Sequence, residues 1–83
     1  MVMYTIALTG AKVQAREVTL ICSTAEGEAR TRGKTDATGV ASMWGPWASS
    51  VRVLVDGEQT AEIREWRERP ADRYAEIELG ERG

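Results

Sequence analysis

Hydrophobic and polar residues alternate along most of the chain in short runs, each about the length of a β-strand. Seven such runs are present, over residues 2–8, 16–23, 29–35, 40–44, 50–55, 59–66 and 74–79. Gly, Asp or Pro punctuates the stretches between them. Alternation with a period of two is typical of strands that bury one face, so we predict an all-β chain.

Two segments have the composition of tight turns. In the stretch 35–41, Asp36 and Gly39 stand three residues apart between β-prone residues. An Asp side chain accepts hydrogen bonds from the backbone N–H groups of a turn, and Gly adopts a positive φ readily. Asp-Gly at residues 56–57 gives a second signal. We expect a hairpin at each position.

Seven short strands at spacings of about ten residues fit a single antiparallel β-sandwich. A chain of 83 residues has the length of one domain, and we assign all of it to that domain with a short polar tail at 80–83. One alternative stays open, because residues 61–69 combine good helix formers with a favourable Glu–Arg spacing. We favour a strand there, since the run is short and Pro70 would have to end a helix.

The order of these segments is similar to that of a known group of folds. The strand Val18–Cys22 precedes the turn segment Thr35–Ala41, and the strand and turn Val51–Gly57 follow it. This pattern resembles the transthyretin-like group of β-sandwiches, which includes carboxypeptidase regulatory-like and bacterial Ig-like modules. The resemblance covers about residues 13–57, and the Trp-Gly-Pro-Trp corner at 44–47 is not part of the group's pattern. Members are mostly non-catalytic modules for adhesion, spacing or assembly, so the resemblance implies a scaffold.

Charge and composition narrow the classes of function. The 13 acidic and 11 basic residues give a formal charge of −2, which argues against a general binder of nucleic acid or anionic membranes. A single cysteine allows no intramolecular disulfide. The start of the chain lacks the pattern of a secretory signal, and no apolar run is long enough to span a membrane. We therefore expect a protein made in the cytoplasm.

Catalysis has little support in the residue types. The chain has no His, the usual general base of Ser and Cys hydrolases and the commonest transition-metal ligand. Cys22 is in phase with the buried positions of its strand, which predicts a small buried hydrophobe rather than a nucleophile. The glutamates that could form a catalytic pair are Glu62, Glu65, Glu76 and Glu78. Because they are expected on outward faces among arginines, they indicate a solvated ion-pair surface. We predict neither an enzyme nor a cofactor site.

The aspartates in the loops are candidates for a metal site. Calcium takes clustered oxygen ligands, often from alternating acidic residues in one loop. Asp36, Asp56 and Asp72 each stand alone in their loops. We therefore predict that they cap turns and that the protein binds no metal.

A basic ladder, Arg30, Arg32 and Lys34, lies on one face of the strand predicted at 29–35. Such a ladder could grip a phosphate backbone or an acidic protein partner, or it could protect an edge strand from pairing with other sheets. No aromatic residue is interleaved for base stacking, which argues against nucleic acid. Pairing with a Glu-rich strand or with an acidic partner stays open.

The three tryptophans are the best indication of function. Trp44 and Trp47 flank the Gly-Pro corner, and Trp66 falls on the outward side of the strand predicted at 59–66. Exposed Trp is enriched at the centres of interfaces, because its large surface is buried on binding. The alternative for the corner pair is that one ring folds back to close the open end of the sandwich. We expect Trp66 to face outward toward a partner.

These observations favour a non-enzymatic protein–protein assembly module. It could be a small virion decoration, head or tail subunit, or a similar part assembled in the cytoplasm, as a homo-oligomer or within a larger particle. One alternative is a carbohydrate- or ligand-binding module that uses Trp44 and Trp47 as a stacking platform. Another is a small inhibitor or regulator that binds its protein partner through a charged face.

Overall fold

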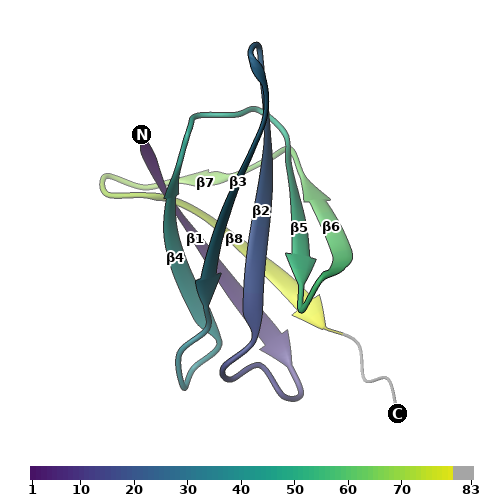
Figure 1. Cartoon of the computed structure of the whole chain (residues 1–83). Helices are drawn as coiled ribbons and strands as arrows, with labels where there is room; N and C mark the ends of the chain where they lie inside the picture. Colours follow the sequence, from purple (N-terminus) through teal and green to yellow (C-terminus); the bar gives the residue numbers. More distant parts are fainter. Residues whose placement is uncertain (80–83) are drawn as a thin grey trace.

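Two four-stranded sheets pack together in the part of the chain that the structure describes, residues 1–79 (Figure 1). The strands of this computed structural model are β1 (Val2–Gly10), β2 (Glu17–Thr24), β3 (Gly27–Lys34), β4 (Val40–Gly45), β5 (Val51–Val55), β6 (Glu58–Ile63), β7 (Arg67–Glu68) and β8 (Arg73–Leu79). The all-β prediction is confirmed. Residues 1–79 form no helix, so the helical alternative for 61–69 is wrong. The described residues therefore contain no helix that could cross a membrane. The polar tail predicted at 80–83 lies outside the described residues.

The direction in which two strands pair departs from the prediction of an antiparallel sandwich. One sheet has the order β4-β1-β8-β7 and the other the order β3-β2-β5-β6. Within the first sheet, β1 and β8 pair in parallel, with Tyr4 opposite Arg73 and Leu8 opposite Ile77. Both strands run in the same direction because the chain returns to the starting end of β1 before it enters β8 (Figure 1). This return places Tyr4 beside Arg73.

The core lies between the sheets and uses the alternating positions that the sequence predicted. Its largest fully buried side chains are Tyr4, Ile6, Leu20, Val18, Val51, Val53 and Cys22. Complete burial of an aliphatic side chain of this size contributes about 1.5–3 kcal/mol to stability. The prediction for Cys22 is confirmed, and burial raises the pKa of its thiol. A thiol in this state is a poor nucleophile at neutral pH.

The turn at Asp36–Gly39 connects the two sheets. Asp36 Oδ1 accepts hydrogen bonds from the backbone N–H groups of Thr38 at 2.9 Å and Val40 at 3.1 Å, so its capping role is confirmed. Gly39 has a φ of 88° and accepts a bond of 2.8 Å from the N–H of Leu8 in β1. The expected hairpin is nevertheless wrong, because β3 and β4 belong to different sheets. The turn carries the chain across the core.

The turn at residues 56–57 is a hairpin as predicted. Asp56 and Gly57 have φ values of 51° and 86°, and two positive values in succession are those of a type I′ turn. Asp56 Oδ1 also accepts a bond of 3.0 Å from the N–H of Glu17, and Oδ2 accepts one from Arg16 Nε. This aspartate therefore ties the β5–β6 hairpin to the start of β2.

Candidate functional site

The three tryptophans lie near the end of the body where β4 ends and β8 begins, but their environments differ. Trp44 and Trp47 are 57% and 61% exposed. Trp66 is half-buried and packs against the core, so the expectation that it faces outward is wrong. Strand β6 ends at Ile63, and the ring of Trp66 lies against Tyr4 with 5.0 Å between the ring centroids.

The inward turn of Trp66 follows from a crossing between the sheets. After β6 the chain leaves one sheet and forms the two-residue strand β7 in the other, between the runs predicted at 59–66 and 74–79. Arg67 pairs there with Tyr74, and Glu68 pairs with Arg73. Trp66 sits at the crossing, and its Nε1 is buried without a hydrogen-bond partner in residues 1–79. Trp66 thus closes the open end of the sandwich, a role that the sequence analysis offered as an alternative for Trp44 or Trp47.

Arg73 is the central residue of this end, and sequence reasoning missed it. Its side chain enters between the sheets and leaves only 7% of the residue exposed. The guanidinium carbon lies 5.1 Å from the ring centroid of Trp47, 5.2 Å from that of Trp66 and 5.8 Å from that of Tyr4. Each such cation–π contact contributes about 0.5–2 kcal/mol. The sequence does contain one indication of this burial. Arg73 stands two residues before the inward residue Ala75, and residues two apart in a strand share a face.

Hydrogen bonds from the same cluster fix the backbone of the Gly-Pro corner. Arg73 Nη1 donates to the carbonyl of Ala48 at 2.7 Å, and its Nε donates to Glu68 at 2.7 Å. The hydroxyl of Tyr4 donates to the carbonyl of Pro46 at 2.8 Å and accepts from the N–H of Ala48 at 3.0 Å. Burial raises the pKa of Tyr4, so this hydroxyl keeps its proton. The corner is rigidly held although its tryptophans are exposed.

Trp44 stands on the outer face of its sheet, next to the half-buried side chain of Met3. In the register of β1 and β4, Trp44 lies opposite Met3. Met1, which precedes the partner of Gly45 in that register, is 89% exposed. We call Met1, Met3, Trp44 and Trp47 the corner surface. Apolar side chains gathered on a fixed backbone form a surface that a protein partner can cover.

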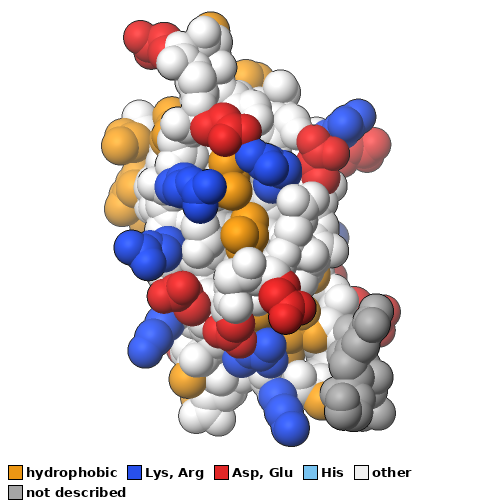
Figure 2. All heavy atoms as spheres, turned by 45° about the vertical axis from the view of Figure 1, so that its right-hand side comes forward, with side chains coloured by type: hydrophobic (Ala, Val, Ile, Leu, Met, Phe, Trp, Pro, Cys, Tyr) orange, Lys and Arg blue, Asp and Glu red, His pale blue; other side chains and the backbone are white. Residues whose placement is uncertain are grey.

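The basic ladder occupies the place that was predicted for it. Arg30, Arg32 and Lys34 alternate as exposed residues along β3, which is an edge strand. Ile21 lies on the same outer face between Arg30 and Arg52, yet it is only 3% exposed. Long arginine stems can shield an apolar neighbour in this way, so part of the ladder supports the sheet. Figure 2 shows acidic and basic side chains interspersed over one face of the molecule, which is typical of a solvated surface.

Asp72 links β1 to the loop between β7 and β8. Its Oδ2 accepts a bond of 2.6 Å from the hydroxyl of Thr5, and Arg69 donates to both of its carboxylate oxygens at 2.6 Å. These bonds lower the pKa of Asp72 from 3.8 to about 2, with the Arg69 contact as the largest cause. Within residues 1–79, no group of three or more acidic or thiol side chains is arranged to hold a metal ion. Asp72 therefore stabilises the loop through side-chain partners, in place of the backbone capping bonds that were predicted for it.

We expect Asp72→Asn to remove part of the acid sensitivity of folding. A carboxyl whose pKa is lower in the folded state adds stability above its unfolded pKa of 3.8 and loses it as the pH falls toward about 2. The variant should therefore be less stable than the wild type at pH 7, and the difference should shrink between about pH 4 and pH 2. Urea unfolding across this range measures it, with the exposed turn residue Glu26 changed to Gln as the control. A constant difference at every pH would contradict the assignment.

Comparison with known proteins found no relative. No family model, curated protein or solved structure matches the chain.

Proposed function

We propose that the chain is a non-catalytic protein–protein assembly module that docks through the corner surface. The observation that carries the proposal is the exposure of Trp44 and Trp47 on a backbone that Tyr4 and Arg73 hold in place. Trp is enriched where interfaces are fully desolvated, because it offers a large contact area with few rotatable bonds. A surface that is already fixed also loses less conformational freedom when it binds.

The same proposal includes the type of fold. We take the two packed sheets to be of the transthyretin-like or Ig-like type, and the Val-rich strands with their Asp-Gly turns support this view. Scaffolds of this kind suit a small virion decoration, head or tail subunit, or a comparable particle assembled in the cytoplasm. The exposed tryptophans support this use, since a subunit must present an apolar surface to its neighbours.

Trp44→Ala and Trp47→Ala test the docking surface. In sedimentation velocity over a range of concentrations, we expect the wild type to associate with itself or with a partner purified from its source. Removal of an interface-centre tryptophan costs at least about 2 kcal/mol, so each variant should bind about thirtyfold more weakly. Arg32→Ala, on the other sheet, is the matched control and should bind like the wild type.

Other outcomes would redirect the proposal. A change in Trp fluorescence with one member of a sugar panel, absent from Trp44→Ala and Trp47→Ala, would identify a glycan-binding module instead. Capture of a single enzyme that loses activity on binding would identify an inhibitor. If Trp44→Ala and Trp47→Ala both associate as strongly as the wild type, the corner surface is not the docking site.

A further inference from the structure

Strand β8 is paired over its full length on one side only. On that side β1 pairs with it from Arg73 to Leu79. On the other side the two-residue strand β7 pairs with Arg73 and Tyr74 alone. In the described chain no strand lies beside residues 75–79 on the side of β7. The N–H and C=O groups of an unpaired edge are a template for a further strand.

Residues 75–79 of β8 are unpaired on this side because the chain before Arg67 lies away from them. A longer β7 would place the residues before Arg67 beside Ala75 and its successors, antiparallel to β8. Instead, Trp66 turns into the core, and residues 58–63 pair with β5 in the other sheet. The position beside residues 75–79 is thus the continuation of an existing strand. An incoming segment that extends β7 would run antiparallel to β8.

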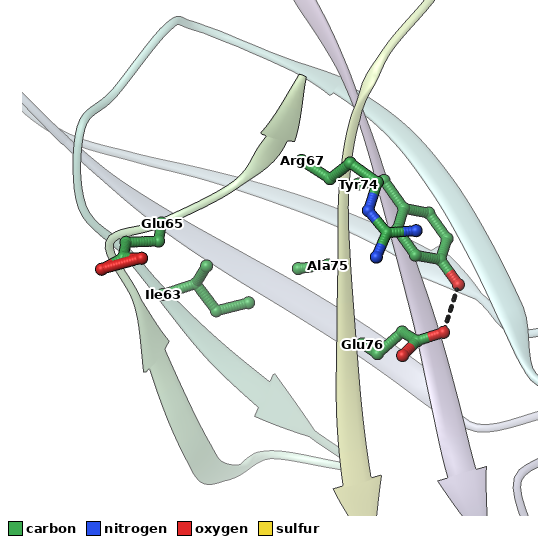
Figure 3. Close-up of a pocket in the computed structure, with 6 residues that line it drawn as sticks. All are labelled: Ile63, Glu65, Arg67, Tyr74, Ala75 and Glu76. Carbon is green, nitrogen blue, oxygen red and sulfur yellow. Dashed lines mark hydrogen bonds between the residues drawn. The ribbon is translucent and has the colours of Figure 1, made fainter. Parts of the chain in front are cut away.

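A groove beside this edge can receive alternate side chains of an added strand. Its volume is about 220 Å³, and its lining residues are Ile63, Glu65, Arg67, Tyr74, Ala75 and Glu76. In Figure 3, Ile63 and Ala75 lie on one side of β8 while Tyr74 and Glu76 point to the other. Side chains of an added strand also alternate between the two faces. Small aliphatic residues would pack on Ile63 and Ala75, and the residues between them would stand beside Glu76.

The charge along the edge indicates what the intervening residues are. Glu76 and Glu78 are exposed two residues apart on the outer face of β8, and Glu65 borders the groove. Arg67 is the basic residue of the groove lining, and it lies at the β7 end. Opposite charges on neighbouring strands attract, whereas like charges directly opposite each other repel. A second β8 laid antiparallel on this edge would bring glutamates together, which disfavours a symmetric dimer.

We propose that residues Ala75–Leu79 bind an extended segment of a different protein, in which Lys or Arg alternates with small aliphatic residues. The segment adds to β8 as an antiparallel strand, places its basic side chains beside Glu76 and Glu78, and buries its aliphatic ones over Ile63 and Ala75. This edge is separate from the corner surface, so the proposal stands without the docking function assigned to Trp44.

The test is an NMR titration with a short capped peptide that alternates lysine and valine. We expect saturable shifts of backbone amides in residues 75–79 and little response to a charge-reversed peptide of glutamate and valine. A peptide with proline in place of valine should also fail, because it cannot donate the ladder hydrogen bonds. Absence of shifts in β8, or equal binding of all the peptides, would overturn the proposal.

Charge-reversal variants make the test specific to this edge. The double variant Glu76→Lys, Glu78→Lys should bind the lysine peptide at least about tenfold more weakly, with greater affinity for the glutamate peptide. Glu26→Lys, at the exposed β2–β3 turn, is the control of the same charge change, and Glu78→Gln is a milder variant should the double one not fold. Trp44→Ala should bind the peptide like the wild type, so failure here and failure of the corner surface are distinguishable. Self-association that the double variant abolishes would assign the edge to a second copy and contradict the proposal.

Discussion

Replacement of Arg73 by Ala will destabilise the fold by about 2–4 kcal/mol, a large share of the stability of so small a domain. The change empties the space between the rings of Tyr4, Trp47 and Trp66 and removes three cation–π contacts. It also leaves the buried carbonyl of Ala48 without the donor that now lies 2.7 Å away. An unpaired buried acceptor is costly because it cannot recover its bonds to water.

The salt bridge of Arg73 is a smaller part of this effect. Its partner Glu68 has a side chain that is 64% exposed, and pairs with such access to water contribute little. Glu68→Gln should therefore cost less than about 1 kcal/mol. Arg67→Ala, an exposed arginine on the adjacent strand, should change stability by about 0.5 kcal/mol or less. Guanidinium unfolding followed by Trp fluorescence measures all three variants, and a small loss for Arg73→Ala would contradict a packing role.

The sequence predicted the strands well because alternation is a local property. Each of the seven predicted runs overlaps one strand of the structure, and Cys22 is buried as its phase in β2 predicted. The turns around Asp36 and Asp56 were also located, since the capping bonds of Asp36 and the positive φ values at residues 56–57 are local features. Strand ends were predicted less accurately: the strand predicted at 59–66 ends at Ile63 in the structure.

Alternation says which face of a strand is buried but not which sheet the strand joins. The link between β3 and β4 resembles a hairpin locally, yet β4 pairs with β1 and not with β3. The parallel pairing of β1 and β8 depends on residues more than sixty positions apart, such as Tyr4 and Arg73. No short-range pattern contains these choices, because they depend on how the whole core closes.

Only the part of the candidate site that depends on neighbouring residues was predicted, for the same reason. Alternation along β4 turns Trp44 outward, and the Gly-Pro corner ends the strand before Trp47, so the exposure of both could be inferred from neighbouring residues. The outward orientation predicted for Trp66 was wrong, and Arg73 was missed, because the environment of both residues comes from distant elements. A buried arginine in particular contradicts the ordinary preference of charged residues for water, and it is tolerated here because three rings and two hydrogen-bond acceptors surround it.

Gly39→Ala will destabilise the protein by about 2–4 kcal/mol, and it separates two effects at the turn between the sheets. A φ of 88° alone costs an L-residue about 1–2 kcal/mol. In addition, a Cβ atom on Gly39 would lie 2.7 Å from Val13 Cγ2 and 2.8 Å from the carbonyl oxygen of Leu8, closer than such contacts allow. The Leu8 oxygen belongs to β1 and cannot move without disturbing the sheet.

Gly57→Ala is the matched control for Gly39→Ala. Gly57 has nearly the same φ, 86°, but an added Cβ would meet nothing within 4 Å. The Gly57→Ala variant should therefore lose about 1–2 kcal/mol of stability, from backbone strain alone. Urea unfolding of both variants gives the difference, which measures the close approach of the Asp36–Gly39 turn to β1. Equal losses would mean that strain accounts for everything and that the turn can shift away from Leu8. A larger loss for Gly39→Ala would mean that the turn holds the two sheets at a fixed separation, so that this glycine stabilises the packing of the whole core.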